Sequence, residues 1–149
     1  MNARVDIFAS SPDIARKWLG FSTEIAGSLE QELVELVKIR ASQINNCANC
    51  LNMHTAEARR AGESEQRIYL LSAWREAPCY SERERAALAW TDALTRISEA
   101  SVEQDTYDEL ARHFSPEEQV KLTMMINVIN GWNRIAIGFK MWFEPAAAA

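Results

Sequence analysis

The 149-residue chain has little of what several protein classes require. Five glycines and four prolines are too few for the many turns of an all-β sandwich. The formal net charge is −5, from 16 basic and 21 acidic side chains, so the basic surface that nucleic acids and anionic membranes attract is missing. Three cysteines are too few, and odd in number, for a disulfide scaffold.

Long apolar stretches are also missing. The longest charge-free apolar segment, residues 122–133, contains Asn127 and Asn130, whereas a membrane span needs about 20 mostly apolar residues. The first residues lack the apolar stretch of a secretory signal. Hydrophobic residues nevertheless make up 48% of the chain, enough for a core. We therefore expect a soluble, cytoplasmic protein of one domain, residues 1–149, with neither a membrane nor a nucleic-acid partner.

Helix-start signals recur along the chain. Four serines are each followed three residues later by Gln or Glu, the pattern of a capping box: Ser28, Ser81, Ser101 and Ser115. Gly62 is placed to end a helix that begins near Cys47. Apolar residues recur at helical spacing, and no alternating run rich in β-branched residues interrupts them. The sequence predicts an all-α, single-domain bundle of about six or seven helices, near residues 12–26, 29–44, 48–61, 65–74, 82–97, 102–113 and 116–141.

Two of the cysteines form a Cys-x-x-Cys pair, Cys47 and Cys50, after a short Asn-rich turn. A cysteine at a helix start faces unpaired amide N–H groups and the positive end of the helix dipole, and both favour the thiolate. His54 follows Cys50 by four residues, so the two share one face of the expected helix, where the imidazole can take the thiol proton. Glu35, on the preceding helix, is placed to orient His54 if the two helices are antiparallel.

Two chemistries fit this pair. One is dithiol redox, in which one sulfur attacks a peroxide or disulfide and the other resolves the product. The other is zinc binding by Cys47, Cys50, His54 and a carboxylate. Zinc sites usually add a distant second pair of ligands, but only Cys79 and His113 remain, and neither has motif spacing. Redox chemistry therefore ranks first, and we expect Cys79 to be a partly buried loop thiol without a redox role.

Four residues stand at a characteristic spacing: Glu35 is separated by eleven residues from Cys47, Cys47 by two from Cys50, and Cys50 by three from His54. This spacing resembles the active-site signature of alkylhydroperoxidase D-like proteins. These proteins belong to the carboxymuconolactone decarboxylase superfamily. Further segments are similar to the same family: residues 40–45, 58–59, 62–63, 81–90 and 130–134. The resemblance therefore covers about residues 15–140. The resemblance implies an all-helical fold and homo-oligomers built from dimers, as trimers or hexamers.

The resemblance also implies an activity, that of a thiol-dependent hydroperoxidase or antioxidant disulfide oxidoreductase. Cys50 would attack the peroxide, and Cys47 would resolve the resulting sulfenic acid as a disulfide. Glu35 and His54 would form the proton relay. No bound cofactor and no metal are expected, because electrons would come from an external dithiol or lipoyl-type reductant or pass on to a peroxiredoxin.

One position departs from the family pattern. Better-studied members carry a second histidine directly before the second cysteine, where this chain has Asn49. An amide can form hydrogen bonds but cannot carry a proton at neutral pH, so the relay is shorter. Two alternatives stay open: a non-peroxidase enzyme like the decarboxylase branch, which lacks the Cys-x-x-Cys pair, and a zinc-binding or structural module.

Overall fold

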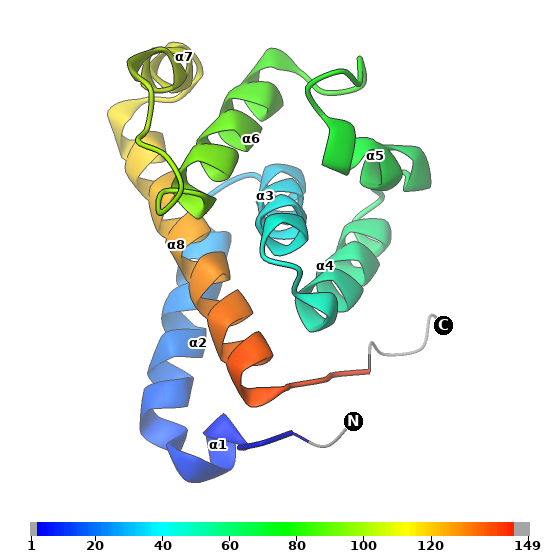
Figure 1. Cartoon of the computed structure of the whole chain (residues 1–149), viewed down its shortest axis with the longest axis vertical. Coiled ribbons are helices and arrows are strands. Elements are labelled where there is room, and N and C mark those ends of the chain that lie inside the picture. The colour runs from blue at the N-terminus through cyan, green and yellow to red at the C-terminus, as the bar shows by residue number, and fades with distance from the viewer. Residues whose placement is uncertain (1–2, 145–149) are drawn as a thin grey trace.

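The computed structural model describes residues 3–144, and every regular element within them is a helix (Figure 1). The elements follow in chain order as α1 (Ile7–Ser10), α2 (Pro12–Ala26), α3 (Gln31–Ile44), α4 (Ala48–Arg60), α5 (Glu65–Leu70), the 3-10 helix η1 (Leu71–Ala73), α6 (Glu82–Thr95), α7 (Gln104–His113) and α8 (Pro116–Phe139). The all-α prediction is confirmed. The predicted helix at 65–74 divides into α5 and η1, and the four-residue α1, capped by the Asp6 carboxylate, adds an element that the sequence did not indicate.

Two of the four predicted helix starts are confirmed. Ser81 and Ser115 form complete capping boxes with Glu84 and Glu118. The other two predictions were wrong, because α3 and α7 begin later, after Glu30 and Glu103. The Ser28 hydroxyl donates to the Ile25 carbonyl at 2.8 Å, so it finishes α2 instead of opening α3.

Helix α3 lies at the centre of the bundle, with α4, α6 and α8 packed around it (Figure 1). Its buried apolar residues point in more than one direction, as expected for a helix enclosed on several sides. Val37 packs with Leu110 and Ile126 of α7 and α8, whereas Ile39 packs on the side of η1 and α6. Each such fully buried aliphatic side chain contributes about 1.5–3 kcal/mol.

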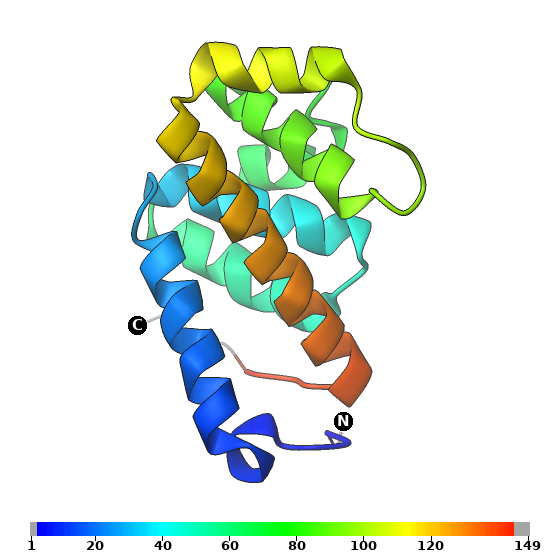
Figure 2. The same ribbon diagram turned by 90° about the vertical axis from the view of Figure 1, so that its left-hand side faces the viewer.

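Helix α2 packs along α8, so that the two form one side of the molecule (Figure 2). Gly131 of α8 permits the close approach, because a Cβ added there would lie 2.6 Å from the Trp18 ring of α2. Trp132 continues the contact, and its indole N–H donates to the Ser22 hydroxyl of α2 at 2.9 Å. This packing places α2 across from α4 (Figure 1).

The segment after α8 turns back towards α4 (Figure 1). Lys140, with φ of 54°, ends α8 in the left-handed conformation. The side chain of Asn49 accepts a hydrogen bond from the Phe143 amide at 2.7 Å, and that of Asn52 donates to the Phe143 carbonyl at 3.2 Å. These bonds hold the segment, residues 141–144, against the first turns of α4. Across residues 3–144, no helix combines the length and apolar character that crossing a membrane requires.

Candidate active site

The antiparallel pair α3 and α4 is joined by a tight turn. Asn46 takes the left-handed conformation, with φ of 56°, which asparagine tolerates better than most residues. The amide of Cys47 donates to the Ser42 carbonyl at 3.0 Å, and Cys47 is the N-cap of α4. The sequence therefore predicted correctly that a helix opens at the cysteine pair.

A largely buried amide network fixes this turn to the rest of the bundle. The side-chain amide of Asn45 donates to the side-chain oxygens of Asn130 and Asn133 on α8, at 2.9 Å each. Asn133 in turn donates to the Ser42 hydroxyl at 3.0 Å, and Asn130 donates to the Thr95 hydroxyl of α6 at 3.0 Å. Because buried amides that find partners rigidify their surroundings, the network sets the position of the cysteine pair relative to α8.

Cys47 and Cys50 are joined by a disulfide, with their Cα atoms 5.3 Å apart. The Cys47 sulfur also accepts the Cys50 amide at 3.4 Å, which caps the helix start. The two residues are only 1% and 4% exposed, and Ala136 and Met141 pack against them. In this oxidised form each sulfur is bonded to the other, so neither is a free ligand for zinc.

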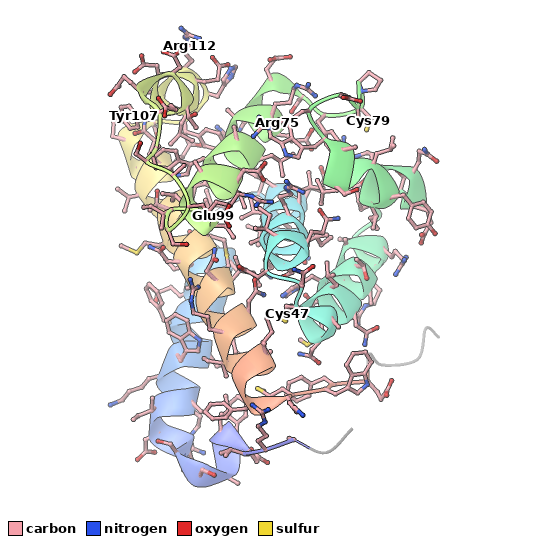
Figure 3. All side chains as sticks on the ribbon, in the orientation of Figure 1. Cys47, Arg75, Cys79, Glu99, Tyr107 and Arg112 are labelled. Carbon is pink, nitrogen blue, oxygen red and sulfur yellow. A yellow bond between two sulfur atoms is a disulfide. The ribbon has the colours of Figure 1, made fainter. Side chains whose placement is uncertain are left out.

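Cys79 is the free cysteine of the described residues and is partly exposed, as expected. It lies in the connection between η1 and α6, far from the Cys47 end of α4 (Figure 3). Its carbonyl accepts a hydrogen bond from Arg67, which links the connection to α5.

His54 lies between two carboxylates. Its Nδ1 atom is 2.8 Å from Oε2 of Glu57 on the same helix and 3.4 Å from Oε2 of Glu35 on α3. Lys38 binds the other oxygen of Glu35, Oε1, at 2.9 Å. The structure thus brings Glu35 and His54 together as the sequence suggested. It adds Glu57 and Lys38, which the sequence reasoning missed, although each lies three residues from its partner on a helix, a spacing that brings side chains together.

The charged groups around His54 act on its pKa in opposite directions. Burial disfavours the imidazolium, but the carboxylates of Glu35 and Glu57 outweigh it, so the pKa of His54 is raised above its ordinary value of 6.5. Lys38 opposes the rise. The contact with His54 holds the pKa of the Glu57 carboxyl below its ordinary value. The two carboxylates therefore stabilise the imidazolium that forms when the neutral His54 takes up a proton.

A cavity of about 880 Å³ opens beside these side chains, between α2, α3, α4, α8 and the segment after α8. Cys50 and His54 line it, together with Glu35, Glu57 and Lys38, whereas Cys47 does not. The remaining wall is mostly apolar and includes Leu19, Val34, Met53, Met125, Ile129, Trp132 and Phe143. Cys50 thus faces a cavity whose wall is mostly apolar. The exception is a charged corner formed by Glu35, Lys38, His54 and Glu57.

Asn49 is buried and has a different hydrogen-bonding role from that of a relay residue. Its side-chain oxygen accepts the Phe143 amide, and its nitrogen donates to the Met53 sulfur at 3.7 Å. Where better-studied relatives are expected to have a histidine, this chain has a residue that holds the segment after α8 in place.

Together, the helical bundle and the Cys-x-x-Cys disulfide at a helix start define an alkylhydroperoxidase D-like protein. The model of the carboxymuconolactone decarboxylase family matches residues 12–93, and the chain belongs to this family. The matched range contains Glu35, both cysteines of the pair and His54.

Three known proteins illustrate what the chain is similar to. The chain is 46% identical over 110 residues to the uncharacterized protein YdfG of Bacillus subtilis (strain 168), covering 74% of this chain and 75% of that protein. A crystal structure of a protein of unknown function from Agrobacterium tumefaciens, named as a candidate antioxidant defence protein AhpD, is 44% identical, with a TM-score of 0.92 over 97% of this chain and 99% of that one. The debrominase Bmp8 shares the fold at 24% identity, with a TM-score of 0.82 over 92% of this chain and 74% of its own.

Proposed function

We propose that this protein is a thiol-dependent peroxidase that reduces hydroperoxides with the Cys47–Cys50 pair. The observation that carries the proposal is the arrangement of the disulfide: Cys50 faces the cavity beside His54 and its carboxylates, and Cys47 lies behind it. This arrangement fits the roles that the family resemblance gives to the two cysteines.

In the first step, the reduced Cys50 passes its thiol proton to His54, and its thiolate attacks the terminal oxygen of the hydroperoxide. An S–O bond forms and the O–O bond breaks, so that Cys50 becomes a sulfenic acid and the peroxide is reduced to an alkoxide. The alkoxide takes the proton from the His54 imidazolium and leaves as an alcohol. Glu35 and Glu57, at 3.4 and 2.8 Å from Nδ1, stabilise the imidazolium in the meantime.

In the second step, the sulfur of Cys47 attacks the sulfur of the Cys50 sulfenic acid. The S–S bond forms, the S–O bond breaks, and hydroxide leaves with the proton of Cys47 as water. The N-cap position of Cys47 favours its thiolate, because the amide of Cys50 donates to the sulfur at the positive end of the helix dipole. The product is the disulfide of the oxidised protein.

In the third step, an external dithiol reduces the disulfide by thiol–disulfide exchange and is itself oxidised. Both sulfurs are nearly covered, so a small dithiol, or a lipoyl-type dithiol at the end of a flexible arm, fits better than a rigid protein surface. A peroxiredoxin would take electrons from the reduced pair by the same exchange. No bound cofactor enters these steps.

The proposal includes self-association. Apolar side chains are exposed on α2 and near the end of α8: Ile14, Leu19, Phe21, Ile137, Phe139, Trp142 and Phe143. Their burial between copies fits the homo-oligomer built from dimers that the family resemblance implies, as a trimer or hexamer. Light scattering of the purified chain measures the mass and tests this part.

The activity is tested by following cumene hydroperoxide consumption with dithiothreitol as the reductant. Cys50→Ser is expected to reduce the rate to the uncatalysed background, because no thiolate then faces the cavity. Cys47→Ser is expected to leave a Cys50 sulfenic acid that dimedone traps, detected by mass spectrometry. Cys79→Ser is the matched control and keeps the wild-type rate.

Equal rates in the wild type and Cys50→Ser would refute the role of Cys50. An activity that survived the loss of both Cys47 and Cys50 would instead support a non-peroxidase enzyme of the same family. The two outcomes can be told apart because the rate of hydroperoxide consumption and the oxidation state of the two cysteines are measured on the same samples.

A further inference from the structure

The charged corner of the cavity has more hydrogen-bond acceptors than donors. Oε2 of Glu35, Nδ1 of His54 and Oε2 of Glu57 all lie within 4.8 Å of one another. Nδ1 can hold only one proton, and Oε2 of Glu57, at 2.8 Å, is the nearer acceptor for it. Lys38 donates to Oε1 of Glu35, which leaves Oε2 of Glu35 buried without a hydrogen-bond partner.

An unpartnered oxygen is unusual in a side chain as buried as Glu35, which is 7% exposed. A buried acceptor without a donor destabilises the folded state, and more so when it is charged. The oxygen faces His54 and Glu57, so a positive charge placed among the three atoms would satisfy both carboxylates at once. The proton on His54 satisfies only one of them by a hydrogen bond.

We propose that Glu35, His54 and Glu57 form a binding site for a divalent transition-metal cation of the Zn²⁺ type. Carboxylate oxygen and imidazole nitrogen are ordinary ligands of zinc, at about 2.0–2.2 Å. Two ligands at that distance from one ion lie about 2.8–3.1 Å apart at a 90° angle and about 3.3–3.6 Å apart in tetrahedral geometry. The separations from Nδ1, 2.8 Å to Glu57 and 3.4 Å to Glu35, lie within these ranges.

This site differs from the zinc site considered from the sequence, because it uses neither cysteine. All three ligands line the cavity, so the remaining coordination positions of the ion face that space and can hold water or an anion. When His54 is neutral, the two carboxylates beside the one cation of Lys38 leave the corner negative, which favours a dication. The proposal is independent of peroxidase activity, although the site shares Glu35 and His54 with the proton relay.

The metal and the proton compete for the same nitrogen. Binding at Nδ1 releases the proton, so the affinity for the metal rises with pH until His54 is neutral without it. The charged groups that face this nitrogen are Glu35 and Lys38 from α3 and Glu57 from α4, with Arg60 acting on Glu57 from the same helix. A metal-bound His54 can no longer accept a thiol proton from Cys50, so the bound ion would also inhibit the proton transfer proposed for the peroxidase.

The test uses the full-length protein carrying Cys79→Ser, oxidised so that no free thiol remains, stripped with chelator and dialysed. Calorimetric titration with ZnCl₂ alone is expected to show one ion per chain, bound more tightly at pH 8 than at pH 6. Glu57→Gln should weaken the affinity at least tenfold. This variant keeps its fold because Glu57 is 38% exposed at its side chain, and circular dichroism verifies the fold.

The matched control is Glu109→Gln, which removes the carboxylate from the contact of Glu109 with His113, 3.0 Å away on α7. It is expected to leave zinc binding unchanged. Nitrogen-15 NMR of the imidazoles should show that zinc shifts Nδ1 of His54. The proposal is overturned by the absence of stoichiometric binding, by equal affinities of the parent and Glu57→Gln, or by coordination through Nε2. Since no peroxide is present, a failed peroxidase assay has no bearing on the result.

Discussion

The chain has two histidines, and each contacts a glutamate about one helical turn away. His54 lies on α4, 13% exposed at its side chain, and receives a second carboxylate from α3. His113 ends α7 next to Arg112, at the end of the molecule that lies away from Cys47 (Figure 3), and its side chain is 27% exposed. The difference shows that a His–Glu pair on one helix is not by itself a candidate active site. It becomes one where a second helix buries the pair and adds a further carboxylate.

Replacing each histidine in turn tests this difference, and we expect the largest effect on peroxidase activity. His54→Gln removes the group proposed to take the Cys50 proton, and we expect hydroperoxide consumption to fall about 10²–10⁴-fold, the usual contribution of a general acid–base residue. His113→Gln should keep the wild-type rate. Initial rates with cumene hydroperoxide and dithiothreitol measure both, and similar losses in the two variants would contradict the assignment.

The next effect concerns the cavity wall formed by α2. Gly131→Ala places a methyl group against the Trp18 ring, and we expect the free energy of unfolding to fall by about 1–3 kcal/mol, the usual cost of overpacking. Gly138→Ala is the control on the same helix, because nothing lies within 4 Å of its added Cβ. It should be neutral or gain up to about 1 kcal/mol from helix propensity. Urea unfolding measures both.

The Gly131 variant also sharpens the comparison between the two histidines. Displacing α2 alters the cavity that His54 lines but not the surroundings of α7. The imidazole resonances of His54 are therefore expected to shift in Gly131→Ala, whereas those of His113 stay in place. Shifts of equal size in both histidines would show that the damage is global.

A smaller effect is expected on the titration of His54. Glu57→Gln removes a carboxylate that stabilises the imidazolium, so the pKa of His54 should fall towards its ordinary value. Proton NMR of the His54 ring across pH 5–9 reports the midpoint. Glu109→Gln is the control and should leave the His54 midpoint unchanged. A His54 midpoint below 6.5 in the wild type would show that burial outweighs the carboxylates.

The smallest effect is on stability. Because the pKa of His54 is raised in the folded state, its stabilising contribution is complete below about pH 6.5, the unfolded value, and is lost as pH rises through the folded value. The wild type should therefore lose more stability between pH 6 and 9 than His54→Gln does. Urea unfolding at both pH values, with His113→Gln as the control, measures the difference. Identical pH profiles for the wild type and His54→Gln would contradict the expectation.

Much of the fold was predictable because its signals are local. Ser81 and Glu84 hold both halves of a capping box within four residues, and Gly62 has a φ of 96° that only glycine adopts easily. Ser28 shows the limit of such signals. A serine near a helix boundary can cap the following helix or finish the preceding one, and the choice depends on where the two helices pack.

The site was predictable in part for the same reason. Cys47, Cys50 and His54 follow one another along one helix, and their spacing is visible in the sequence. The distance between Glu35 and His54 depends on how closely α3 and α4 pack, which the sequence does not state. The role of Asn49 was beyond reach, because its partner, Phe143, lies 94 residues away.

The same separation has a consequence for the newly made protein. The segment that Asn49 holds is synthesised 94 residues after it, which takes on the order of 5–20 seconds on the ribosome. During that interval α4 lacks Ala136 and Met141, which pack against both cysteines in the finished fold, so the pair is less covered than in the complete protein. A chain whose pair oxidises during translation then closes over a finished disulfide, and one whose pair stays reduced closes over two thiols.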